Sequence, residues 1–165
     1  ETPRIGETPA SLAARLAQEK AQSLIATYAN SIIIGCDQTG NCNGLLLHKP
    51  GSVLAAQDQL AQMSGQRATF YTAMTVIHVL NGAVKTLTHD LDTTQLQLRT
   101  LSHEQITAYI AQDNPIDCAG SFKIESLGII LFDAVQTSDP SALEGISLIQ
   151  LTSRLLDLGV RLGAA

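Results

Sequence analysis

The sequence predicts an α/β fold, in which helices cover the faces of a mixed, twisted central sheet. Three features lead to this prediction: an unbroken apolar run at 32–34, several segments that open with helix-capping residues, and the pair Asn81-Gly82 between two β-rich stretches. Strand-like and helix-like segments alternate along 165 residues, which is the length of one ordinary domain. We therefore expect a single domain over residues 1–165.

The segment Ser31–Gln38 is the centre of the predicted sheet. Three consecutive isoleucines lead into Gly35 without a polar residue, as in a strand that is buried on both faces. Asp37 follows one residue later, after Cys36. Because open α/β sheets bind ligands at the carboxyl ends of their strands, we expect Asp37 to lie at a ligand-binding edge.

Helices are expected over four segments: residues 7–30, 52–63, 102–114 and 147–158. Thr8 with Pro9, Ser52, and Ser102 with Gln105 are the capping residues of the first three. Lys20 falls in the middle of the apolar ridge of the first helix. Its side chain either bends to the helix edge or points into a pocket at the sheet.

The other strands follow from turn chemistry. Asn81-Gly82 is typical of a two-residue hairpin and predicts strands over 68–80 and 83–99. Asn41, Asn43 and Gly44 are typical turn residues, and they predict a second hairpin within 39–48. A last strand is expected over 128–135.

Composition narrows the functional classes. A net charge of −5 without any basic run disfavours a nucleic-acid polymer as partner. No apolar stretch approaches the roughly 18 residues that span a bilayer. Three cysteines without a C-x-x-C pair predict neither a zinc site nor a disulfide framework, and they favour the cytoplasm.

Charged residues recur at the predicted ends of elements. Lysines and carboxylates in such positions suit a phosphate substrate with a divalent metal, Mg²⁺ or Mn²⁺, because lysines neutralise phosphate oxygens while acids hold the metal or activate water. The candidates are Glu1, Lys20, Asp37, Lys49, Lys123 and Glu125.

The order of short motifs resembles the Maf family of nucleoside-triphosphate pyrophosphatases. The motifs are E-T-P, L-A-x-x-K-A, I-I-G-x-D-Q, K-P, F-Y-T and C-A-G-S-F-K-x-E, and the similarity runs from residue 1 to about residue 158. The pair D-Q resembles the subgroup that acts on 7-methyl-GTP, whereas the subgroup that acts on dTTP and UTP usually has D-T. The resemblance implies hydrolysis of a modified nucleoside triphosphate to the monophosphate and pyrophosphate.

The resemblance also implies roles for individual residues. Asp37 takes the place of the proton acceptor, and Asp37 and Glu1 match the acids at the metal. Lys20 and Lys49 match lysines that hold phosphate oxygens. Gln38 and Glu125 match positions associated with base selection, while Thr72 and Lys123 are weaker matches that line the pocket.

One departure from the family pattern leaves alternatives open. The family begins with a strand and an S-x-S-x-x-R loop that grips the triphosphate, and neither is in this sequence. We therefore expect an N-terminally truncated domain that lacks the first strand and loop. The alternatives are a dTTP- or UTP-type enzyme and an inactive nucleotide-binding protein. The resemblance implies a homodimer, although no apolar stripe identifies an interface.

Simpler interpretations of the same residues exist. Asp37 suits a turn or a helix cap, and Lys49 before Pro50 suits a solvated loop. Glu125 and Lys123 are spaced to pair on one face of a strand. Gln38 needs no role beyond a polar strand end.

Overall fold

The computed structural model describes residues 2–161 and residue 163. Within them, four α-helices accompany a five-stranded sheet of order β2-β1-β3-β4-β5, which confirms the predicted α/β class. The helices are α1 (Pro9–Gln22), α2 (Val53–Met63), α3 (His103–Asp113) and α4 (Leu148–Asp157), and the strands are β1 (Ser31–Cys42), β2 (Leu45–Leu47), β3 (Arg67–Leu80), β4 (Ala83–Leu98) and β5 (Phe132–Gln136). Three 3₁₀ turns complete the order: η1 (Ala119–Ser121), η2 (Leu127–Leu131) and η3 (Pro140–Glu144).

The chain forms two compact units. The first unit comprises residues 1–38, 71–92 and 138–165, and the second comprises 39–70 and 93–137. Strands β1, β3 and β4 each begin in one unit and end in the other. That the whole chain is a single domain stays a prediction.

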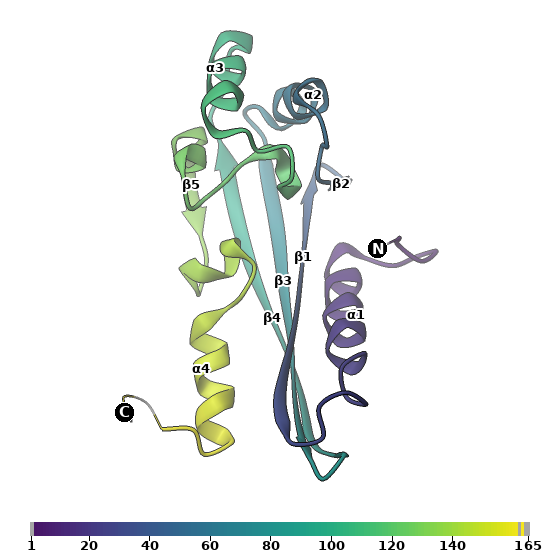
Figure 1. The fold of residues 1–165 in the computed structure, drawn as a ribbon. Helices are drawn as coiled ribbons and strands as arrows, with labels where there is room; N and C mark the ends of the chain where they lie inside the picture. The colour runs from purple at the N-terminus through teal and green to yellow at the C-terminus, as the bar shows by residue number, and fades with distance from the viewer. Residues whose placement is uncertain (1, 162, 164–165) are drawn as a thin grey trace. The chain divides into compact units, whose positions relative to one another are not determined.

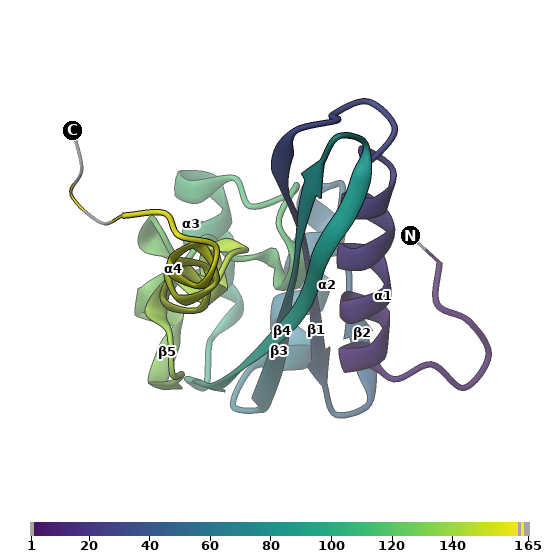
Figure 2. The same ribbon diagram turned by 90° about the horizontal axis from the view of Figure 1, so that it is seen from below.

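In the first unit, α1 lies along one face of the strands (Figures 1 and 2). Small side chains of α1 make this close approach: Ala13 and Ala17 pack on Ala73, and Ala21 packs with Ile33. On the other face, α4 is tied to β4 by the ion pair of Arg154 with Asp90 at 2.7 Å. The sheet of this unit therefore has a different helix on each face.

The local signals of the first unit behave as the sequence predicts. Thr8 caps α1 in a reciprocal pair with Ser11, and Pro9 begins the helix. The helix ends at Gln22 and not near residue 30. Asn81 and Gly82 both have positive φ, 52° and 73°, as a two-residue hairpin turn of the right twist requires.

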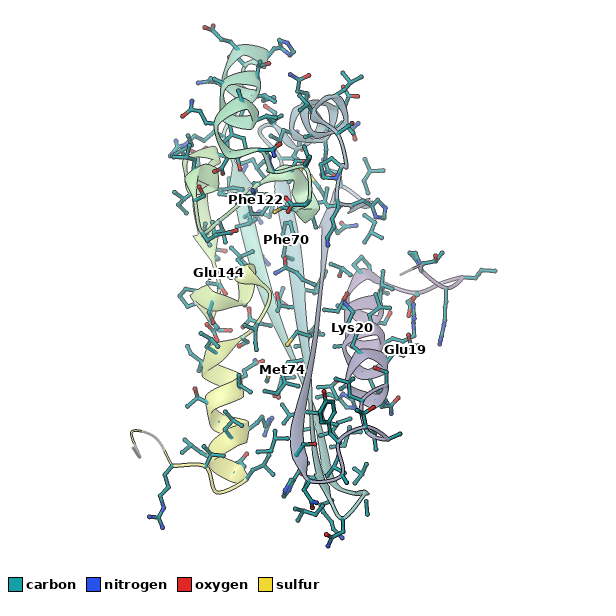
Figure 3. The ribbon with its side chains drawn as sticks, in the orientation of Figure 1. Glu19, Lys20, Phe70, Met74, Phe122 and Glu144 are labelled. Atoms are coloured by element: carbon teal, nitrogen blue, oxygen red, sulfur yellow. The ribbon has the colours of Figure 1, made fainter. Side chains whose placement is uncertain are left out.

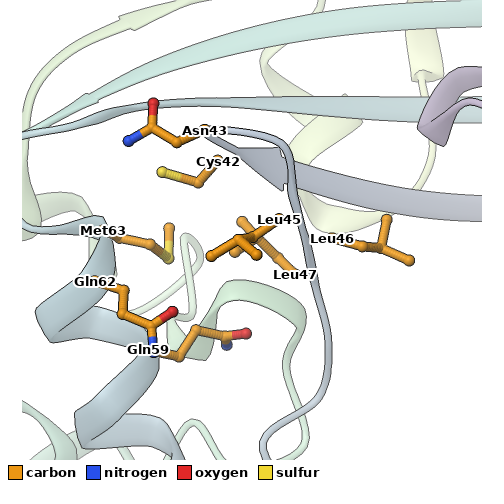
Figure 4. Close-up of a pocket in the computed structure, with 8 residues that line it drawn as sticks. All are labelled: Cys42, Asn43, Leu45, Leu46, Leu47, Gln59, Gln62 and Met63. Carbon is orange, nitrogen blue, oxygen red and sulfur yellow. The ribbon is translucent and has the colours of Figure 1, made fainter.

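In the second unit, α2 and α3 pack together, and Ser52 and Ser102 cap them as predicted. Asn43 and Gly44, with positive φ, turn the predicted hairpin, in which β1 and β2 pair from Gly40↔Leu47 to Cys42↔Leu45. The core contains edge-to-face rings: Phe70 and Phe122, labelled in Figure 3, have ring centres 5.3 Å apart. The ring centres of Phe122 and Phe132 are 5.0 Å apart. A hollow of about 90 Å³ lies between this hairpin and α2 (Figure 4).

Three details of the strand predictions are wrong. The segment 31–35 is not buried on both faces, because Ile33 is buried while Ile34 is 39% exposed. Strand β1 also does not end before Asp37; it continues to Cys42, since its last residues pair with β2. Similarly, the predicted strand 128–135 begins as η2, and only β5 is extended.

None of the helices in the part of the chain that the structure describes is long and apolar enough to cross a membrane.

Candidate active site

Close packing of α1 on β1 positions the first part of the site. A β-carbon on Gly35 would lie 2.3 Å from the carbonyl oxygen of Ala17 and 2.8 Å from Cβ of Ala21. Only glycine therefore allows the helix to lie this close to the strand. Asp37 is two residues further along β1, so its side chain points to the same face as Gly35.

Lys20 and Asp37 meet across this contact. Lys20 Nζ lies 2.5 Å from Asp37 Oδ1. The Asp37 side chain is 8% exposed and that of Lys20 is 45% exposed, so a buried carboxylate is paired with an ammonium group that also reaches solvent. Figure 3 shows the position of Lys20 on α1. The Lys20 side chain is therefore directed at the sheet; that it points into a pocket there stays a prediction.

Gln38, the next residue of β1, points to the opposite face. Its amide Nε2 donates to Thr72 Oγ1 at 2.9 Å, to the Ala142 carbonyl at 2.8 Å and to the Leu143 carbonyl at 3.3 Å. Thr72 Oγ1 in turn donates to the Ala142 carbonyl at 2.8 Å. Gln38 and Thr72 are thus brought together as a pair, but not on the face that carries Asp37.

One edge of β1 has no described strand beside it at this point. Strand β2 pairs with β1 only at residues 40–42, and β3 is the neighbour of β1 on the other side. Among the described residues, no strand lies beside residues 31–38 of β1 on the β2 side. Asp37 and Gln38 therefore lie on opposite faces of β1, beside an edge that no described strand covers.

Three predicted site residues, Lys49, Lys123 and Glu125, belong to the second unit. Lys49 is exposed in the segment between β2 and α2. Lys123 Nζ lies 3.9 Å from Asp117 Oδ1, and Glu125 is exposed. Lys123 and Glu125 lie in a turn and not on a strand, so the simple interpretation of a cross-face pair is wrong.

The turn that carries Lys123 and Glu125 is held by two residues of α3. The backbone N–H of Lys123 donates to the Tyr109 hydroxyl at 3.0 Å, and Ser126 Oγ donates to Asp113 Oδ1 at 2.5 Å. Burial, with Asp113 nearby, raises the pKa of Tyr109 well above its usual range, so the hydroxyl stays protonated. Sequence reasoning missed both residues, although Tyr109 and Asp113 are four apart on one helix face.

Asp139 is another residue that sequence reasoning missed. It is 3% exposed and caps η3 by accepting from the Ser141 N–H at 3.0 Å. It also accepts from Ser147 Oγ and from the Ile149 N–H, both at 2.7 Å, and so caps the start of α4. Burial opposes ionisation, but these hydrogen bonds outweigh it and lower the pKa of Asp139 below 3.8. The local sequence Asp-Pro-Ser was the available signal.

The cysteines are not activated as nucleophiles. Burial raises the pKa of Cys36 and of Cys42, and burial with Asp117 nearby raises that of Cys118 to about 11. All three thiols are therefore protonated at neutral pH.

A metal ion would find few protein ligands here. The described residues contain no group of three or more histidine, cysteine or acidic side chains that could hold one. Glu1, the predicted partner of Asp37, lies outside the described residues. The donor set fits Mg²⁺ or Mn²⁺ only if the substrate's phosphate oxygens complete the coordination, a common arrangement for Mg²⁺.

Comparison with known proteins identifies the family of this chain. The family model for Maf-like proteins matches residues 1–158. The chain belongs to the Maf family. A 7-methyl-GTP pyrophosphatase of Xanthomonas oryzae pv. oryzae is 44% identical over 162 residues, which cover 98% of this chain and 83% of the relative. The 7-methyl-GTP pyrophosphatase of Hahella chejuensis is 42% identical, over 94% of this chain and 79% of the relative. That of Saccharophagus degradans is 43% identical, over 91% of this chain and 75% of the relative.

Proposed function

We propose that this Maf protein hydrolyses 7-methyl-GTP, or a similarly modified nucleoside triphosphate, to the monophosphate and pyrophosphate with the help of a divalent metal. The enzyme class follows from the family and from relatives named 7-methyl-GTP pyrophosphatase: it is a nucleoside-triphosphate pyrophosphatase, a hydrolase. The substrate and the metal are our proposal. The ligand is a free nucleotide and not a nucleic-acid polymer or a membrane, which agrees with the acidic charge.

The observation that carries the proposal is the contact of Lys20 with Asp37. Two residues that are 17 positions apart form an ion pair around a nearly buried carboxylate, beside an edge of β1 that no described strand covers. A general base must be ionised to accept a proton, and the ammonium group stabilises that charged form. Asp37 is thereby suited to deprotonate water.

The reaction needs one proton transfer and one displacement. Asp37 takes a proton from water as the water oxygen bonds to the α-phosphorus, and the bond from that phosphorus to the bridging oxygen breaks, so pyrophosphate leaves. Lys20, within reach of Asp37, places positive charge near the developing charge on the phosphate oxygens. Lys49 and Lys123 are the further cations that we assign to the phosphate chain.

The metal has a restricted role in this proposal. Asp37 would hold Mg²⁺ or Mn²⁺ together with Glu1 and substrate oxygens, and the bound ion would neutralise phosphate charge and lower the pKa of a bound water. The removal of divalent ions by a chelator should therefore abolish turnover and leave the melting temperature nearly unchanged.

Base selection is assigned to Gln38 and Glu125. A 7-methylguanine ring carries positive charge and N–H donors, so a carboxylate and an amide oxygen are complementary to it. The pair Asp37-Gln38 favours this substrate over dTTP or UTP, because the Maf subgroup that acts on dTTP and UTP usually has D-T at this place.

The test is pyrophosphate release from a nucleotide panel of 7-methyl-GTP, GTP, dTTP, UTP and ATP, with Mg²⁺ or Mn²⁺. Asp37→Asn should lower turnover at least about 100-fold, the usual contribution of a general base. Asp90→Asn is the matched control, because Asp90 is also nearly buried, at 10% exposed, and paired with a cation at 2.7 Å.

Three results would count against the proposal. If the wild-type chain releases no pyrophosphate from any nucleotide, the chain is a binding protein and not an enzyme. If Asp37→Asn is as fast as wild type, Asp37 is not the base. If dTTP or UTP is the best substrate, the assigned specificity is wrong.

A further inference from the structure

Three candidates outside the assigned chemistry stand out. An apolar hollow of about 250 Å³ lies between α3 and η2, but nothing in the structure indicates what would occupy it. The exposed apolar side chains of α4 likewise lack an indicated partner. The third candidate is the hydrogen-bond network that joins Asp139, η3 and Gln38, and it carries an inference.

We propose that Asp139 is a positioning residue for base selection, because it fixes the turn whose carbonyls hold Gln38 in one orientation, as an acceptor only. This inference rests on the proposed function, in which Gln38 contacts the base. It adds the reason why Gln38 would accept a specific base and reject others.

The orientation of the Gln38 amide follows from its partners. A primary amide nitrogen has two hydrogens, and carbonyl oxygens can only accept. The Ala142 and Leu143 carbonyls both lie within 3.3 Å of Nε2, so this end of the side chain must be the nitrogen. An amide flipped by 180° would place its oxygen against two carbonyl oxygens.

Thr72 accounts for the other hydrogen of the Gln38 amide nitrogen. Its hydroxyl hydrogen is directed at the Ala142 carbonyl, so its oxygen accepts from Gln38 Nε2. Both hydrogens of Nε2 are therefore used within the protein. Gln38 is half-buried, and Oε1 is the atom that it can offer to a ligand.

Asp139 holds the carbonyls in place. It accepts hydrogen bonds from the backbone and hydroxyl of Ser141, at 3.0 and 2.6 Å, at the start of η3. It also binds the Ile149 N–H of α4, so one carboxylate joins both ends of the segment that contains Ala142 and Leu143. Loss of these bonds should free η3 and with it the amide of Gln38.

The predicted ligand class is a base with an N–H donor where it meets Oε1. Guanine and 7-methylguanine present N1–H and an amino group along one edge, whereas adenine N1 presents a lone pair. A lone pair opposite the Oε1 oxygen is repelled, and a fixed amide cannot rotate to donate instead. An unlocked amide could rotate and would lose this discrimination.

The test compares the dissociation constants of 7-methyl-GMP and AMP by calorimetry, so that it does not depend on turnover. Wild type should bind 7-methyl-GMP at least about tenfold more tightly, the effect of one good hydrogen bond against one repulsive contact. Asp139→Asn and Thr72→Val should each reduce this ratio to about threefold or less. Thr72→Ser, which restores the hydroxyl, and Asp90→Asn, a matched buried acid in the same unit, should keep the wild-type ratio.

The outcomes separate this inference from the proposed function. An unchanged ratio in Asp139→Asn and Thr72→Val, an equal loss in Asp90→Asn, or no preference in wild type would overturn the inference. Selective binding by wild type that both variants lose would support it, even if no pyrophosphate release is found and the proposed function fails.

Discussion

Lys20 Nζ and Asp37 Oδ1 are 2.5 Å apart, yet the two side chains differ widely in their access to water. The lysine is 45% exposed and the aspartate only 8%. Replacing one partner therefore leaves a charge that reaches water in one case and a nearly buried charge in the other. When Asp37 is replaced, the ammonium group of Lys20 still reaches solvent, whereas when Lys20 is replaced, the Asp37 carboxylate stays enclosed by α1 and β1.

The first prediction uses this asymmetry. Lys20→Met should cost about 1–2 kcal/mol of unfolding free energy, and Asp37→Asn clearly less, because only the first change leaves a charge in a buried position. Urea denaturation of both variants and of the double variant measures the coupling. Equal losses in the two single variants would contradict the prediction. Lys85→Met, on the exposed part of β4, is the control for loss of a lysine.

The second prediction concerns the close approach of α1 to β1. Gly35→Ala should destabilise the protein by about 3 kcal/mol, since its new β-carbon would overlap the backbone of Ala17 and Ala21, which cannot move as a flexible side chain can. Gly82→Ala tests the cost of positive φ alone, because its β-carbon would meet no atom within 4 Å, and it should lose about 1 kcal/mol.

Turnover of the Gly35→Ala variant gives a second readout. If α1 shifts away from β1, Lys20 no longer reaches Asp37, so turnover should fall even below the unfolding temperature. Full turnover in folded Gly35→Ala would show that the ion pair does not depend on this contact.

Local signals allowed most helices to be predicted from sequence. Thr8 with Pro9, and Ser102 with Gln105, act within one turn of the chain, so the residues that decide the helix start are adjacent in sequence. The turns at Asn43-Gly44 and Asn81-Gly82 are local in the same way.

The site was harder to predict, because its decisive contacts are not local. Where β1 ends depends on its pairing with β2, so a pattern of three isoleucines could not place Asp37 inside the strand. Gln38 is held by Ala142, which is 104 residues away. The alternation of a strand also separates Asp37 from Gln38, which read as one motif in the sequence.

The third prediction is a pH dependence at the start of α1. The Arg15 side chain, with Arg4 nearby, lowers the pKa of Glu7 from 4.5 to about 2. Because the folded state favours the ionised form, this stabilisation is complete above pH 4.5 and is lost as the pH falls toward 2. The difference in melting temperature between wild type and Glu7→Gln should be constant at neutral pH and shrink in that acidic range. A difference that grows on acidification would have the wrong sign.

The last prediction concerns Glu125 in the second unit. Glu125 is exposed and Lys123 pairs with Asp117, so the removal of the Glu125 carboxylate breaks no ion pair found among the described residues. Glu125→Ala should therefore leave the melting temperature nearly unchanged but relax the preference for 7-methyl-GTP over GTP, because a carboxylate attracts the positive charge that methylation adds to the ring. We expect the ratio of kcat/KM values to fall about three- to tenfold, as for one solvent-exposed charge contact. Glu104→Ala, which removes an acid from the first turn of α3, is the control and should not alter the ratio. An unchanged ranking of the two nucleotides in Glu125→Ala would remove Glu125 from base selection and leave that role to Gln38.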